Sequence, residues 1–202
     1  MQIAKSPNTR DRLLRATSEL FSLQGYSGTG LKAVVGRAGV SLGSLYHFFP
    51  NGKSQLGAEA ILEAGGRVER GMVSRLKDQP DAASGLNALF DAEAAHLEAT
   101  SFEGGCPAAG AALDASCESE EIRLACAEVF ARWRRVLEEA FNGWGHDADS
   151  AEAYAQLSLS SLEGAILVSR AEGSTTALRR TQAALAALFE PGRTPAVVRP
   201  AP

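Results

Sequence analysis

Apolar residues recur at the spacing of an α-helix along nearly the whole chain, and the alternation typical of a β-strand is hard to find. The clearest stretch is 120–141, where Ile122, Val129, Trp133 and Leu137 fall on one stripe. This period predicts an all-α fold of about nine helices. We expect them at 9–24, 30–38, 42–48, 54–77, 82–100, 107–116, 120–141, 151–171 and 175–189.

Glycine, serine and proline mark where these helices begin, end or weaken. Gly39 can take the positive φ of a tight turn after the second predicted helix, and Ser41 can cap the third. The fourth helix contains the pair Gly65-Gly66, which should weaken or bend it. Four prolines between 191 and 202 predict a loose tail.

The third predicted helix has two distinct sides. Its core side should carry Leu45, Phe48 and Phe49. Its outer side carries small and polar residues: Gly43, Ser44, Tyr46 and His47. A helix-turn-helix presents such a side to the major groove, where hydroxyls and an imidazole reach phosphates and base edges. The alternative is a plain three-helix core that binds nothing.

The charge distribution is uneven along the chain. The net charge is −4, yet the first 53 residues hold seven basic and two acidic side chains, a net of +5 that leaves −9 for the rest. A basic module joined to a larger acidic one favours a different partner for each part, with DNA suited to the first. A chance excess on a solvated face is the alternative.

Composition and motifs argue against other classes of protein. With 45% apolar residues the chain can fill a core, but no apolar run reaches the roughly 18–20 residues of a membrane span, so we expect a cytoplasmic protein. Cys106, Cys117 and Cys126 form no CxxC pair and should be reduced thiols. Gly52-Lys53-Ser54 imitates the end of a P-loop, but His47 stands where that motif requires glycine. We therefore predict no enzymatic activity, no cofactor and no metal.

The chain resembles TetR-family transcriptional regulators in the stretch GTGLKAVVGRAGVSLGSLYHFFPNGKSQL at 28–56, preceded by RDRLLRATSELFSLQGY at 10–26. It is similar to the LmrA/YxaF branch in GSLYHFFPNGK and in GCPAAGAALDA at 105–115, whereas Gly30 and Leu42 depart from the residues common in the family. The family domain would span about 7–67, with its helix-turn-helix at about 30–49. We assign DNA binding to 1–53, ligand binding and dimerisation to 54–190, and a flexible tail to 191–202.

The resemblance implies three sets of site residues. Contacts to DNA would come from Thr29, Ser41, Leu42, Gly43, Ser44, Tyr46, His47 and Lys53. An effector pocket would use Phe90, Glu93, His96, Leu97, Phe102, Cys106, Leu113, Phe130, Trp133 and Leu137, although ordinary core packing is an alternative for each of them. A homodimer would form on the last two helices through Leu157, Ser161, Gly164, Val168, Leu178 and Leu185.

These expectations combine into one functional hypothesis. The protein would be a ligand-responsive transcriptional repressor, a homodimer that holds a near-palindromic operator in double-stranded DNA until a small-molecule effector, aromatic in the LmrA/YxaF branch, releases it. The helix at 54–77 would couple the two sites, with Gly65-Gly66 as a hinge. Two alternatives stay open: a helical dimeric small-molecule-binding or interaction protein that does not use its DNA-binding head, and a thiol-dependent enzyme or redox sensor around Cys106.

Overall fold

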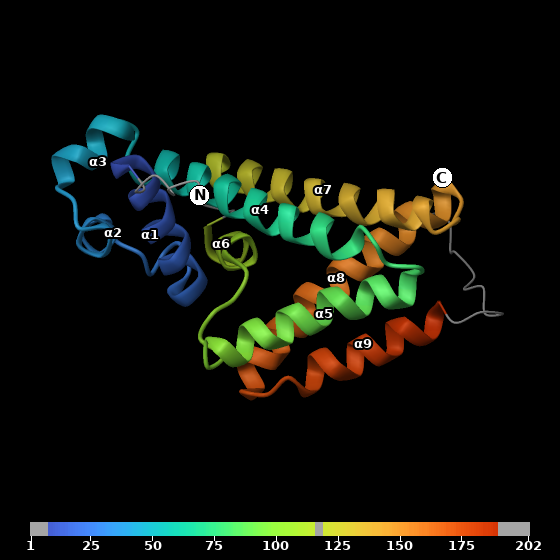
Figure 1. Cartoon of the computed structure of the whole chain (residues 1–202). Coiled ribbons are helices and arrows are strands. Elements are labelled where there is room, and N and C mark those ends of the chain that lie inside the picture. Colours follow the sequence, from blue (N-terminus) through green and yellow to red (C-terminus); the bar gives the residue numbers. More distant parts are fainter. Residues whose placement is uncertain (1–7, 116–118, 190–202) are drawn as a thin grey trace, which may run out of the picture. The chain divides into compact units, whose positions relative to one another are not determined.

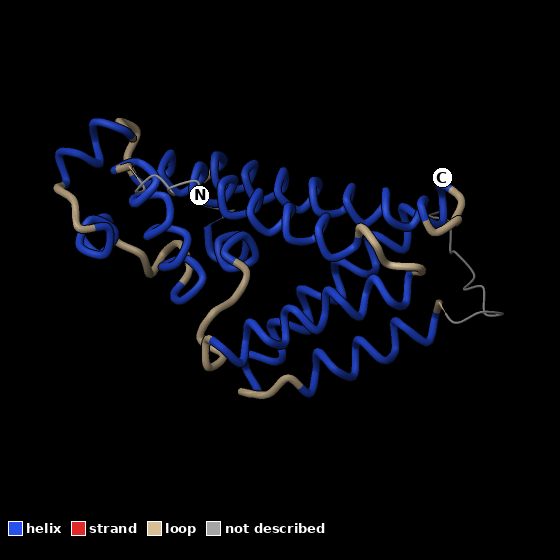
Figure 2. Tube along the Cα trace, viewed as in Figure 1, coloured by secondary structure: helices blue, strands red, loops and turns tan. Residues whose placement is uncertain are grey.

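The computed structural model describes residues 8–115 and 119–189, and every regular element in those ranges is an α-helix (Figure 1, Figure 2). The helices are α1 (Thr9–Gln24), α2 (Leu31–Ala38), α3 (Leu42–Phe48), α4 (Lys53–Leu76), α5 (Ala82–Ala99), α6 (Pro107–Ala115), α7 (Glu120–Gly143), α8 (Ala148–Glu172) and α9 (Thr176–Leu188). The predicted all-α class is confirmed. Among these helices, none is both long enough and apolar enough to span a bilayer.

Side-chain caps and glycines set the helix ends, largely as predicted. Ser41 accepts a hydrogen bond from the Ser44 amide at 3.1 Å, and Gly39 ends α2 in the left-handed conformation with φ +62°. The helix predicted from residue 151 begins at Ala148, because Asp147 accepts the Ser150 amide and caps the helix earlier.

The described residues form two compact units. The first contains 8–67 with the described part of 106–130, and the second contains 68–105 with 131–189. The helices α4 and α7 each contribute to both units. The functional division at Lys53 stays a prediction, and the expected tail at 191–202 lies outside the described residues.

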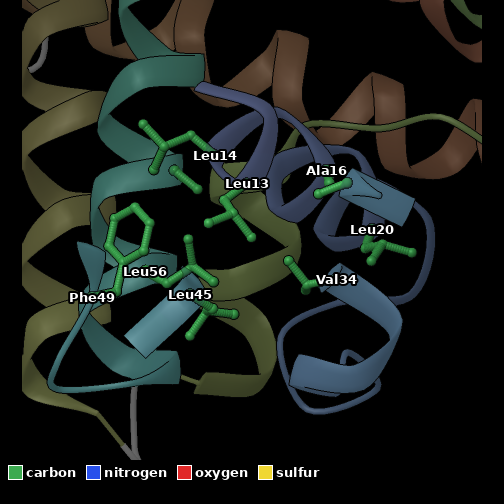
Figure 3. Packing of buried hydrophobic residues seen from close by; sticks show 10 residues of the cluster. Leu13, Leu14, Ala16, Leu20, Val34, Leu45, Phe49 and Leu56 are labelled. Carbon is green, nitrogen blue, oxygen red and sulfur yellow. The ribbon is translucent and has the colours of Figure 1, made fainter. Parts of the chain in front are cut away.

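One apolar cluster in the first unit joins α1, α2 and α3 to the start of α4 (Figure 3). Leu13, Leu45 and Phe49 have no exposed surface at all. Phe48, which we expected in this core, is instead 37% exposed. Neighbouring residues at a helix end point in different directions, and Phe49 at the C-cap takes the inward position.

The pair Gly65-Gly66 does not interrupt α4, which is a single helix from Lys53 to Leu76. A Cβ atom added at Gly65 would lie 2.5 Å from Cγ2 of Val129, a residue of α7 in the same unit. Gly57, two turns earlier, faces Ile122 of α7 in the same way, at 2.8 Å. These glycines therefore allow α4 and α7 to pack closely along the first unit.

The second unit packs α5, α8 and α9 together. Where α7 meets α8, Phe141 is fully buried and contacts Trp144, His146, Tyr154 and Phe189 with ring centroids 5.2–5.6 Å away. Aromatic rings at such distances and tilts stabilise one another beyond the area they bury. This cluster fixes the ends of α7, α8 and α9.

Candidate nucleic-acid interface

The short helix α3 has one anchored side and one exposed side. Leu45 and the C-cap residue Phe49 hold it to the core of the first unit. The exposed residues include Tyr46, with 47% of its surface accessible, and Leu42, with 40%. Of the other predicted DNA contacts on this segment, Ser41, Gly43 and His47 are exposed and Ser44 is half-buried.

The turn between α2 and α3 is held by an arginine from α1. The guanidinium of Arg12 donates hydrogen bonds to the carbonyl oxygens of Ala38 and Gly39, the latter at 2.9 Å. A Cβ atom at Gly39 would lie 2.8 Å from Arg12 Nη2, so glycine serves both the left-handed conformation and the approach of the arginine. A cation near the last carbonyls of α2 also complements the helix dipole.

Sequence reasoning missed this role of Arg12. It counted the residue only as one basic charge of the head. Its partners lie 26 and 27 positions away in the sequence, and no local pattern signals such a contact.

Thr29 is a correction to the predicted DNA contacts. The residue is 1% exposed, and its hydroxyl donates to the Gly25 carbonyl at 2.7 Å. The hydroxyl also receives a long contact from the amide nitrogen of Gln24, at 3.4 Å. Thr29 therefore closes the turn between α1 and α2 instead of offering its side chain to a phosphate.

Lys53, the first residue of α4, makes a cation–π contact with Tyr26. Its Nζ lies 4.1 Å from the ring centroid of Tyr26, which is itself buried and packs edge-on against Phe21 at 5.5 Å. A cation over the face of an aromatic ring is attracted electrostatically and is held in place. Gly52 before it has φ +69°, and a Cβ there would meet Tyr46 at 3.6 Å, so the start of α4 lies beside the exposed side of α3.

Some basic side chains of the first 53 residues form ion pairs within the first unit. Arg37 pairs with Glu19 at 2.8 Å, and Arg10 pairs with Glu59 while lying over the ring of Phe49. The simple count of basic residues therefore overstates the charge available to DNA. Lys5, counted among the seven basic residues, lies outside the described residues.

The predicted effector residues are divided between the two units. Seven lie in the second unit: Phe90, Glu93, His96, Leu97, Phe102, Trp133 and Leu137. Cys106, Leu113 and Phe130 lie in the first. Leu113 is 75% exposed, because its position on α6 turns away from the buried side formed by Ala108 and Ala111, so it does not fit the prediction of a pocket-lining residue.

Within the second unit, the two expected polar anchors differ in how far they are buried. Burial raises the pKa of Glu93 above its ordinary value, and the charges of His96 and Arg75 only partly oppose this shift. His96 itself is exposed, on the same helix α5. Glu93 is half-buried and is therefore the more shielded of the two candidate anchors.

The cysteines differ in environment. Burial raises the pKa of the Cys126 thiol to about 11, and the nearby charge of Asp114 adds to the shift, so this thiol stays protonated and unreactive at neutral pH. Cys106 lies at the start of α6, where its sulfur accepts the Ala109 amide at 3.4 Å. Cys117 lies outside the described residues.

The predicted dimer residues also separate into two groups. Leu157 and Val168 of α8 are exposed, Gly164 is open, and Ser161 is half-buried. Leu178 and Leu185 of α9 are 0% and 4% exposed in the single chain, because α9 packs this side onto α5 and α8. These two leucines therefore offer almost no surface to a partner.

Comparison with known proteins covers both halves of the chain. Residues 13–60 match the family described as bacterial regulatory proteins of the tetR family, and residues 82–184 match the C-terminal domain described as transcriptional regulator LmrA/YxaF-like. The HTH-type transcriptional regulator LmrA of Bacillus subtilis is 32% identical over 171 residues, which cover 85% of this chain and 91% of that protein. An HTH-type regulator of Mycobacterium tuberculosis, Rv0196, is 33% identical over 174 residues, 84% of this chain and 88% of that protein.

Solved structures share the fold. A regulatory protein TetR from Rhodobacter sphaeroides superposes with a TM-score of 0.80 at 23% identity, covering 90% of this chain and 98% of that one. The regulator CifR, solved as a cysteine mutant in complex with a 26-base-pair double-strand operator DNA, gives a TM-score of 0.78 at 22% identity, covering 94% of this chain and all of that one.

Proposed function

The chain belongs to the TetR family of transcriptional regulators, and from this premise we propose that it is a repressor that binds its operator as a homodimer and leaves it when a small-molecule effector binds. The family assignment makes it a regulator with a DNA-binding fold, and not an enzyme. The observation that best supports operator binding is α3, whose capped and anchored backbone turns Tyr46, His47 and Ser41 outward. We also propose a cytoplasmic location, because operator binding requires access to DNA.

The proposed dimer uses the exposed side of α8. Leu157, Gly164 and Val168 follow one another at helical spacing on that side, and Leu167 next to them is 53% exposed. A Cβ atom at Gly164 would meet nothing within 4 Å, so another helix can approach the backbone there. Two-fold symmetry would place two α3 helices roughly 34–36 Å apart, which requires a near-palindromic operator.

The proposed effector site lies in the second unit, around the apolar side chains of Phe90, Leu97, Trp133 and Leu137. All four are buried, and Glu93 on α5 brings a carboxylate with a raised pKa into the same unit. Such a mixture of aromatic and aliphatic side chains with one polar group suits an aromatic effector. The effector would act by favouring a dimer whose two α3 helices no longer fit successive major grooves.

The test begins with selecting bound fragments from random duplexes. Fluorescence anisotropy should then show a clear preference for the selected duplex over a scrambled one, and a steep loss of affinity as salt rises. Tyr46→Phe and His47→Ala should each lower operator affinity about tenfold or more without lowering thermal stability. Asn142→Ala, a change to an exposed polar residue near the end of α7, is the control.

Two outcomes would contradict the proposal. Equal and weak binding to selected and scrambled duplexes would remove operator recognition. If the Tyr46 and His47 variants bound the selected operator with full affinity, α3 would not be the helix that recognises DNA. This result would favour a small-molecule-binding protein that does not bind DNA through α3.

A further inference from the structure

One carboxylate reaches the turn that leads into the helix-turn-helix from a distant part of the chain. Asp114 lies near the end of α6, and its Oδ2 accepts the Ser27 amide at 2.8 Å while Oδ1 accepts the Tyr26 amide at 3.3 Å. Two successive backbone N–H groups that converge on one anion form a nest. Hydrogen bonds to a charged acceptor are stronger than those between neutral groups, so this contact fixes the backbone at Tyr26 and Ser27.

The turn is shaped around this carboxylate. Gly25 has φ +73°, and a Cβ atom at that position would lie 2.6 Å from Asp114 Oδ2. On its other side the turn is closed by Thr29, which donates to the Gly25 carbonyl, and by Gln24, which donates to the Gly28 carbonyl at 2.9 Å. Glycine at position 25 therefore serves both the backbone conformation and the room that the carboxylate needs.

Close packing of α6 on α1 brings Asp114 to this place. Gly110, one helical turn before Asp114, would carry a Cβ atom only 3.2 Å from the carbonyl oxygen of Phe21. The thiol of Cys126 on α7 donates to the Ala108 carbonyl at 3.4 Å, which attaches α6 to α7 as well. All of these contacts lie within the first unit.

The held turn supports two parts of the candidate interface. The ring of Tyr26 carries Lys53 above it, at the start of α4. The turn also ends at Gly30, the N-cap residue of α2, so its backbone sets where α2 begins. A shift of Tyr26 and Ser27 would therefore displace Lys53 and α2 relative to each other.

We propose that Asp114 is a positioning residue for operator binding. Its carboxylate holds the turn at 25–29 so that α2, α3 and Lys53 are presented to DNA in one fixed arrangement. The residue acts through the turn and not by contact with DNA. This inference rests on the proposed function, because it presumes that the head binds an operator.

The decisive variant is Asp114→Asn, with Asp78→Asn as its control. Asp78 is exposed in the turn after α4, and both changes remove one negative charge, so the two variants have the same net charge. Because a local change in charge alters non-specific attraction to phosphate, each variant is measured on the selected and on the scrambled duplex. We expect the ratio of operator affinity to scrambled-duplex affinity to be about tenfold lower in Asp114→Asn than in the control. A head that was merely less folded would lose affinity for both duplexes in proportion.

Amide hydrogen exchange gives a readout that is independent of DNA. The amides of Tyr26 and Ser27 should exchange faster in Asp114→Asn than in the wild type, and at the wild-type rate in Asp78→Asn. If Asp114→Asn does not fold, Gly110→Ala serves in its place. Its added methyl would lie 3.2 Å from the Phe21 carbonyl oxygen, so α6 and α1 must separate by a few tenths of an ångström, and the same selective loss of operator affinity is expected.

The outcomes are distinguishable. Equal operator affinity for Asp114→Asn and Asp78→Asn, or a proportional loss on both duplexes, would overturn the positioning role and leave the proposed function intact. A wild-type protein that prefers no selected duplex would overturn the proposed function together with this inference.

Discussion

Gly65 offers a direct test of how α4 and α7 pack in the first unit. Replacing it by alanine places a methyl group 2.5 Å from Cγ2 and 2.8 Å from Cγ1 of Val129. Both side-chain atoms belong to a buried, β-branched residue with little rotamer freedom in a helix, so the strain must be relieved by moving one helix. Gly36→Ala is the matched control, because Gly36 lies inside α2 of the same unit and a Cβ atom there meets nothing within 4 Å.

Two opposing effects set the change in the free energy of unfolding. Alanine in place of glycine stabilises a helix interior by about 1 kcal/mol, and this gain applies to both variants. Overpacking a close contact costs about 1–3 kcal/mol, and this cost applies to Gly65→Ala alone. We therefore expect Gly36→Ala to raise the free energy of unfolding by about 1 kcal/mol. The free energy of unfolding of Gly65→Ala should be about 1–3 kcal/mol lower than that of Gly36→Ala.

Urea unfolding followed by circular dichroism measures both values, with the slope m checked for equality between the variants. If Gly65→Ala were as stable as Gly36→Ala, α4 and α7 would have free space between them. Gly65 would then be better understood as the flexible hinge that the sequence suggested.

Three further predictions concern single side chains. Arg12→Met should lower the free energy of unfolding by about 1 kcal/mol or more, because it removes two charge-assisted hydrogen bonds to the α2–α3 turn. Arg15→Met, at an exposed residue of α1, should not lower it. Equal melting temperatures for the two variants would show that Arg12 does not hold the turn. Because burial raises the pKa of Glu93, its protonated form is favoured in the folded state, and stability is lost as pH rises above its ordinary value of 4.5. Glu93→Gln should therefore be more stable than the wild type at pH 7 and equal to it in acid, and Glu139→Gln, at an exposed residue of α7, is the control for the loss of one negative charge. Urea titrations in which Glu93→Gln is no more stable than the wild type at pH 7 would refute the burial argument. Burial likewise raises the pKa of Cys126 from 9.0 to about 11, so its contribution to stability is complete below pH 9 and disappears as pH rises toward 11. Cys126→Ala should flatten that dependence, and alkylation of native Cys126 at pH 8 would show that the thiol is not buried.

The two ends of α6 are stabilised by different side-chain contacts. The sulfur of Cys106 accepts the Ala109 amide at one end, and Asp114 accepts two amides of the α1–α2 turn at the other. The Cys106 contact caps the first turn of α6, whereas the Asp114 contacts tie the other end of α6 to the α1–α2 turn.

The amino-acid sequence by itself determined the helices and the two sides of α3. The apolar period is a local property, and hydrophobic burial converts it into helices with a defined inner side, so the bounds of α1 and α3 agree with those predicted. Caps such as Ser41 and the positive φ of Gly39 are equally local, because each depends on residues only a few positions away.

Only the tertiary structure decided what several side chains do once those helices meet. Thr29 is turned into its own turn, Leu178 and Leu185 are buried in the single chain, and Gly65 is a packing contact. Arg12 and Asp114 reach backbone groups between 26 and 88 positions away, and no periodic pattern encodes such a pair. The reason is physical: an unsatisfied backbone carbonyl or amide can be paired by any suitable side chain that packing brings near, and packing depends on the whole fold.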